Sequence, residues 1–178
     1  MLAHPTQERL LALGLAGMAR ALDDQRRHPD IAALSFEERL ALLLDRETIE
    51  RENKRLVARL RFAALRQEAV VEDLDVRAAR GLDRALFQKL AGGEWIDRKQ
   101  NVLIVGPTGV GKSWPACALG HKACRDNRSV VYHRVPRLLE ALALARGDGR
   151  HGRLLKAISR VQLVGAVPRP WTTGAWRR

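Results

Sequence analysis

The chain has 178 residues, 46% of them hydrophobic, which is enough to bury the core of one ordinary domain or two small ones. No apolar run approaches the length of a membrane span, and the N-terminus lacks the basic start and apolar segment of a signal peptide, so we expect a cytoplasmic protein without a membrane partner. The net charge of +12 favours a polyanionic partner such as nucleic acid.

The first third of the chain has the pattern of amphipathic helices. One helix is predicted from apolar residues that recur at helical spacing, namely Leu11, Leu15, Met18 and Leu22. His28-Pro29 should end it. Ser35 and Glu38 form a capping box that begins a second helical stretch, which continues or restarts beyond Leu56.

A basic stripe lies on that second stretch. Arg51, Arg55 and Arg59 stand at i, i+4 and i+8, with Lys54 beside them, and we predict that these four residues contact DNA phosphates. The alternative is a solvated helix face, in which Glu47 and Glu50 pair with Arg51 and Lys54 at the favourable spacing of four residues.

The domain organisation is predicted from a change of pattern after the helices. Val70 to Arg80 is an acidic, mixed segment that reads as a linker or a short edge strand, so residues 1–70 are predicted to form an α-helical N-terminal module and residues 71–164 a separate core. A short helix ending at Gly92-Gly93 opens this core.

The motif at the centre of the core is a phosphate-binding loop. It matches G-x-x-x-x-G-K-[ST] at every fixed position, with the residues Gly106, Pro107, Thr108, Gly109, Val110, Gly111, Lys112 and Ser113. The apolar run Asn101–Val105 before it predicts a strand, and a helix should follow. Backbone N–H groups of such a loop surround the phosphates of a nucleotide. The alternative is a glycine-rich turn that binds nothing.

Two residues of the loop have predicted roles of their own. Lys112 should reach the β- and γ-phosphate oxygens of ATP, and Ser113 should offer its hydroxyl to a Mg²⁺ ion that bridges them. Cys117 and Cys124 in the following helix lie about 10 Å apart along its axis, too far for a disulfide and too few for a zinc site. We predict that both are small buried core residues.

Strand and helix patterns alternate after the loop. Ser129–His133 reads as a strand, Pro136 begins a helix, and a further helix precedes the strand pattern of Val161–Val164. This order predicts an α/β core with a parallel sheet.

The last residues, 165–178, break that pattern. They contain prolines and tryptophans, show no periodicity and do not read as an element of the core. From Gly149 to the C-terminus there is no acid, whereas seven residues are basic: Arg150, Arg153, Lys156, Arg160, Arg169, Arg177 and Arg178.

From about Arg9 to about Leu163 the chain resembles the IstB-like ATP-binding proteins, which help insertion-sequence transposases and are related to bacterial helicase loaders. Beyond the loop, the resemblance rests on four stretches: Leu34–Leu40, Gly81–Arg84, Ala116–His121 and Arg137–Leu139 with Leu154-Leu155. It implies an AAA+ P-loop ATPase that binds ATP and Mg²⁺, assembles as an oligomer on DNA and acts with a transposase.

Two positions depart from the family. Pro115 follows Trp114, which is costly inside a helix but cheap in its first turn. The family strand after Arg160 ends in the paired acids of Walker B, whereas Gly165 follows Val164 here. Family topology also places the loop strand between two later strands. The expected fold is therefore an incomplete AAA+ core with parallel strands, C-terminally truncated, and ATP hydrolysis is expected to be deficient.

Several alternatives remain open at this point. The chain could be a fragment of a helicase-loader-like replication ATPase, a nucleotide or small-molecule kinase, or a non-enzymatic DNA- or partner-binding remnant that uses residues 1–70. For the tail we favour a change of reading frame, because the codons of Trp171–Gly174 permit Asp-Asp-Trp in a displaced frame. The nucleotide sequence would decide this.

Overall fold

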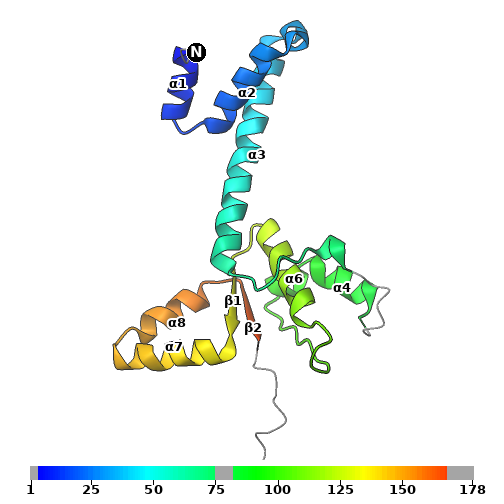
Figure 1. The fold of residues 1–178 in the computed structure, drawn as a ribbon, viewed down its shortest axis with the longest axis vertical. Helices are drawn as coiled ribbons and strands as arrows, with labels where there is room; N and C mark the ends of the chain where they lie inside the picture. The colour runs from blue at the N-terminus through cyan, green and yellow to red at the C-terminus, as the bar shows by residue number, and fades with distance from the viewer. Residues whose placement is uncertain (1–3, 75–81, 168–178) are drawn as a thin grey trace, which may run out of the picture. The chain divides into compact units, whose positions relative to one another are not determined.

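The computed structural model describes residues 4–74 and 82–167, and it divides the chain into two compact units, residues 1–57 and 58–178. The N-terminal unit contains α1 (Pro5–Ala12), α2 (Ala16–Arg27), the 3₁₀ helix η1 (Pro29–Ala33) and most of α3 (Phe36–Ala63) (Figure 1). The division lies within α3, before the boundary predicted near residue 70. The prediction of a helical N-terminal region is confirmed.

The single helix predicted from Leu11 to Leu22 is wrong, because the chain turns between α1 and α2. Gly14 has φ +73°, a left-handed conformation that ends a helix and that glycine adopts without steric cost. The Leu15 amide donates back to the Leu10 carbonyl at 2.8 Å. The apolar spacing continues across the turn, which is why periodicity alone does not reveal it.

The capping box at the start of α3 is confirmed. The Ser35 amide donates to Glu38 Oε2 at 2.8 Å, and the Glu38 amide donates to Ser35 Oγ at 3.3 Å. Each side chain thus satisfies a backbone group near the first turn of the helix. From this start α3 runs for 28 residues without a break.

The C-terminal unit alternates helices with two strands. Its elements are η2 (Val71–Asp73), α4 (Arg84–Ala91), α5 (Glu94–Asp97), α6 (Ser113–Arg125), β1 (Val130–Arg134), α7 (Val135–Gly147), α8 (His151–Ser159) and β2 (Leu163–Val167). The strands pair in parallel, from Val130 opposite Leu163 to Arg134 opposite Val167. The predicted α/β core with parallel strands is confirmed, and Pro136 lies in the first turn of α7 as expected.

The strand predicted over Asn101–Val105 does not form. The side chains still alternate between half-buried and exposed, with 86% of Leu103 and 80% of Val105 accessible. Within the described residues, β1 and β2 pair only with each other, so this segment has no neighbour with which to build a ladder of hydrogen bonds. Its apolar composition alone cannot make it a strand.

The predicted start of the aberrant tail at Gly165 is also corrected, because Gly165 to Val167 belong to β2. Gly165 lies opposite Tyr132, and a Cβ at this glycine would be 3.2 Å from Tyr132 Cδ2. The small residue therefore leaves room for the tyrosine ring. Residues 168–178, with the codons that suggest a frame change, lie outside the described residues.

The core of the C-terminal unit gathers around α6. Its buried members are Ala69, Phe87, Cys117, Ala118 and Leu119, and half-buried residues such as Leu65, Trp114 and Tyr132 pack against them. Both cysteines are buried and free, as predicted, and burial raises the pKa of the Cys124 thiol. Helix α6 is therefore held along its length, and its first residue, Ser113, has a defined position.

Candidate nucleotide-binding site

The eight residues of the predicted phosphate loop lie together at the start of α6. Gly106 to Lys112 form an exposed or half-buried loop, and Ser113 is the first residue of the helix. Gly109 has φ +89° and Gly111 has φ +83°. A residue with a Cβ rarely adopts such angles, so the glycines of the motif stand where the backbone turn requires them.

The backbone N–H groups of this loop are available as donors. Among the described residues, the amides of Gly109, Val110, Gly111 and Lys112 donate to no acceptor, while the Trp114 amide donates to the Gly111 carbonyl at 2.9 Å. The first N–H groups of α6 also lack partners within the helix. Exposed donors at a helix N-terminus are an arrangement that fits phosphate oxygens.

Lys112 closes the loop on itself. Its ammonium group donates to the carbonyl oxygen of Gly106 at 2.7 Å and to that of Pro107 at 2.6 Å. The positive charge therefore lies over the loop that offers the free amides. An ammonium group so placed is within reach of a phosphate that the amides hold.

Ser113 lies close to a residue that the sequence did not single out. Burial raises the pKa of Tyr132, and the Ser113 hydroxyl partly opposes this rise. The two hydroxyl groups do not meet the geometry of a hydrogen bond, and Tyr132 Oη is buried without a partner among the described residues. No sequence signal could have found this neighbour, because it depends on how β1 packs beside α6.

No group of three or more His, Cys, Asp or Glu side chains in the described part of the chain could hold a metal ion. Phosphate-loop proteins generally hold Mg²⁺ with the loop Ser or Thr and a Walker B Asp, and of these ligands the sequence predicts Ser113 alone. Pro115 is the third residue of α6. In this first turn its missing N–H breaks no helical hydrogen bond, so Pro115 occupies the position where its cost is expected to be small.

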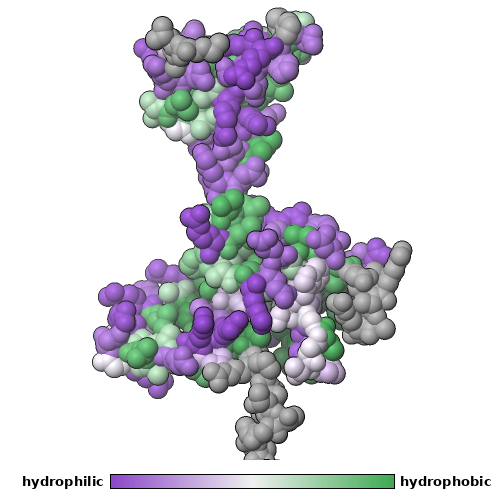
Figure 2. All heavy atoms as spheres, viewed as in Figure 1, coloured by the Kyte–Doolittle hydropathy of each residue, from purple (hydrophilic) through white to green (hydrophobic). Residues whose placement is uncertain are grey.

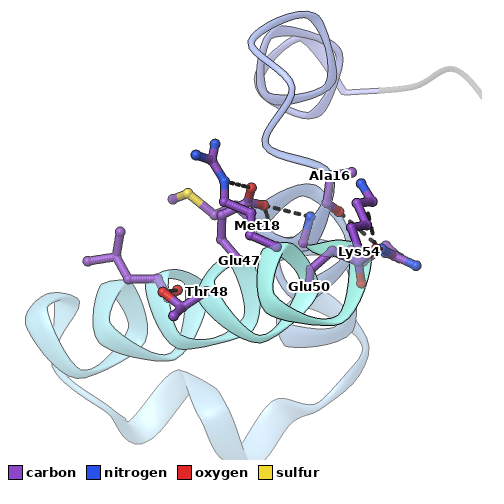
Figure 3. A network of polar contacts seen from close by, with 10 residues as sticks. Ala16, Met18, Glu47, Thr48, Glu50 and Lys54 are labelled. Carbon is purple, nitrogen blue, oxygen red and sulfur yellow. Dashed lines mark hydrogen bonds and ion pairs between the residues drawn. The ribbon is translucent and has the colours of Figure 1, made fainter. Parts of the chain in front are cut away.

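The predicted DNA-contacting stripe is largely occupied by contacts within the chain. Arg51 Nε lies 2.7 Å from Glu47 Oε1, and Lys54 Nζ lies 3.7 Å from Glu50 Oε1 (Figure 3). Arg59 Nε donates to the carbonyl oxygen of Cys124, at the end of α6, at 2.9 Å. Arg55 is exposed and has no ion pair within the described residues.

Some of these contacts could be predicted from the sequence, and one could not. Glu47 and Glu50 are spaced to pair with Arg51 and Lys54, and the structure forms both pairs. The partner of Arg59 is 65 residues away along the chain, so only the fold reveals it. Contact of these residues with DNA stays a prediction.

Comparison with known proteins identifies the family. Residues 8–166 match the family described as IstB-like ATP binding protein. The chain belongs to this family. The match covers the N-terminal helices, the phosphate loop and both strands, so the resemblance noted in the sequence is confirmed.

Individual relatives are similar over the same region. An insertion sequence ATP-binding protein of Sinorhizobium fredii is 59% identical over 164 residues, which are 92% of this chain and 67% of that protein. The ATP-binding protein of insertion sequence IS1162 from Pseudomonas fluorescens is 50% identical over 169 residues, 92% of this chain and 71% of that protein. The match thus spans about two thirds of the length of these relatives. None of the helices described here is long and apolar enough to cross a membrane.

Proposed function

We propose that this IstB-like chain binds ATP with Mg²⁺ at Gly106–Ser113 and serves as an ATP-binding helper of a transposase on DNA. The observation that carries the proposal is the set of free loop amides at the start of α6, with the Lys112 ammonium beside them. The names of its relatives, insertion sequence ATP-binding proteins, support the link to transposition.

The residues of the loop have different roles in nucleotide binding. The amides of Gly109 to Lys112 and the first turn of α6 hold phosphate oxygens. Lys112 exchanges its two carbonyl acceptors for a charged phosphate, which accepts a stronger hydrogen bond. Ser113 would supply its hydroxyl to a magnesium ion, whose charge would offset that of the phosphates.

We further propose that this chain alone hydrolyses ATP no faster than background. Strand β2 consists of Leu163, Val164, Gly165, Ala166 and Val167, and none of these side chains can accept a proton or orient a water molecule. Phosphoryl transfer depends on such positioned groups. In this proposal the nucleotide acts as a ligand that favours assembly on DNA in several copies with the transposase.

Calorimetric titration of the full chain with ATP and Mg²⁺ tests the site. We expect saturable binding that Lys112→Ala weakens by about 10- to 100-fold, the range for a lost hydrogen bond to a charged group. Lys89→Ala, which removes an exposed charge from α4, should leave the affinity unchanged. Equal affinity in wild type and Lys112→Ala would exclude the loop as the site.

A phosphate-release assay on the same samples tests the second part. We expect no release above that of a sample without protein. Turnover that Lys112→Ala abolishes would show that another residue of this chain supplies the missing acid.

A further inference from the structure

We propose that the basic face of α8, formed by Arg153, Lys156 and Arg160, contacts the phosphate backbone of duplex DNA. This inference rests on the proposed action on DNA and names the surface that carries it. The three residues stand at i, i+3 and i+7, and Arg160, the residue that caps α8, keeps a helical backbone conformation. They therefore share one side of the helix.

The cations of this face are accessible. All three side chains are exposed, and none takes part in an ion pair within residues 4–74 and 82–167. Arg150, at the other end of α8, differs because its guanidinium pairs with Asp148. The charge of the basic face is thus not neutralised by the described part of the chain.

The opposite side of α8 explains why the basic face points outward. Leu154 and Ile158 are half-buried, and α8 packs against α7. Figure 2 shows hydrophilic side chains over the α7–α8 hairpin, beside smaller apolar patches. The apolar side of the helix therefore packs against α7, and its cations lie on the solvent-exposed side.

The sequence around α8 adds a second reason. No acid occurs between Gly149 and the C-terminus, and Asp148, the acid nearest before α8, pairs with Arg150. A cationic face whose charges are not paired with acids attracts phosphates and gains from the release of their counterions. On α3, by contrast, Arg51 and Lys54 already face acids.

The dimensions of the face suit one strand of DNA. Arg153 and Arg160 are seven residues apart, about 10 Å along the helix axis. One DNA strand carries a phosphate about every 3.4 Å of duplex axis. Three long cationic side chains over this length can reach neighbouring phosphates of one strand, and such contacts carry no base specificity.

Fluorescence anisotropy of a labelled duplex over a salt series, with the full chain, tests the proposal. The variant Arg153→Gln/Lys156→Gln/Arg160→Gln keeps helix-forming residues on α8. We expect it to bind more weakly and to lower the slope of log K against log salt by about three, one for each lost phosphate contact. Its circular dichroism and melting temperature should match those of the wild type.

The matched control is Arg84→Gln/Lys89→Gln/Lys99→Gln, which removes the same charge from three exposed residues of the same unit. We expect its salt slope to stay near that of the wild type. An unchanged slope in the α8 variant, or an equal fall in both variants, would overturn the assignment to α8 and leave the proposed function standing. If the wild type does not bind DNA at all, the proposed function itself fails on this point.

A single substitution provides a separate test in case the triple variant does not fold. Arg153→Gln should lower the slope by about one, and Arg153→Lys, which keeps the charge, should restore it. A slope that Arg153→Gln does not change would count against the inference.

Discussion

The ammonium group of Lys112 lies 2.7 Å from the carbonyl oxygen of Gly106, so the last loop residue before α6 is tied to the first residue of the loop. The bond is exposed to solvent, and exposed hydrogen bonds contribute little to the free energy of unfolding. A phosphate would give the same ammonium group a charged acceptor. Lys112 is therefore expected to matter for binding far more than for stability.

Lys112→Ala should separate these two effects. Without nucleotide, its unfolding free energy should stay within about 0.5 kcal/mol of the wild type, as for most surface substitutions. ATP with Mg²⁺ should raise the melting temperature of the wild type more than that of the variant, because a ligand stabilises the folded state in proportion to how tightly that state binds it. Thermal melts with and without ATP measure both. A lower melting temperature of Lys112→Ala without ATP would mean that the lysine is structural.

Gly111→Ala should impair the loop through its backbone. At φ +83° a Cβ costs about 1–2 kcal/mol, so the loop should change shape and bind ATP about tenfold more weakly or worse. Calorimetry measures this. Gly147→Ala is the control, because a Cβ there meets no atom within 4 Å and alanine favours the end of α7. Wild-type affinity in Gly111→Ala would argue that the loop amides do not hold phosphate as described.

Gly17→Ala should destabilise the N-terminal unit. A Cβ at Gly17 would lie 2.7 Å from Glu47 Cα and 2.8 Å from the Arg46 carbonyl oxygen. Both are backbone atoms, so α2 would have to move away from α3, at a cost of about 1–3 kcal/mol. Urea unfolding followed by circular dichroism measures the loss. Gly152→Ala on α8, where a Cβ meets nothing within 4 Å, should cause no loss.

Glu47 should make the stability of the same unit depend on pH. Its carboxylate accepts hydrogen bonds from Arg51 Nε and from the amides of Gly17 and Met18 (Figure 3), and Arg51 contributes most to lowering its pKa below the ordinary value of 4.5. Because the folded-state pKa is lowered, this stabilisation is present above about pH 4.5 and is lost as the pH falls through the folded-state value. Glu47→Gln should therefore be less stable near neutral pH, and the difference from wild type should shrink in acid. Melting temperatures between about pH 7 and pH 3 test this, and a constant difference would contradict it.

Arg59 should behave as a structural residue. Its guanidinium donates to the Cys124 carbonyl at the end of α6, and Arg59→Gln should cost about 1 kcal/mol of stability through the loss of this hydrogen bond. The salt dependence of DNA binding should not change. Arg55→Gln, on an exposed residue of the same helix, should leave stability unchanged. If the salt slope of Arg59→Gln instead falls by about one, Arg59 contacts a DNA phosphate, as the sequence predicts.

The sequence by itself determined the features that depend on neighbours along the chain. The capping box of Ser35 and Glu38, the start of α7 at Pro136 and the glycine turn that leads into α6 formed as predicted, because each is decided within a few residues by hydrogen bonds or by backbone angles. The parallel pairing of β1 and β2 followed from the alternation of strands and helices.

Only the tertiary structure decided the features that need a distant partner. Asn101–Val105 has the composition of a strand but no neighbour to pair with, and β2 continues to Val167 because β1 lies beside it. Arg59 looks like one more exposed cation until α6 brings the Cys124 carbonyl to it. The sequence pattern indicates which contacts a residue is able to make. The atoms that the fold places within hydrogen-bonding distance decide which of these contacts form.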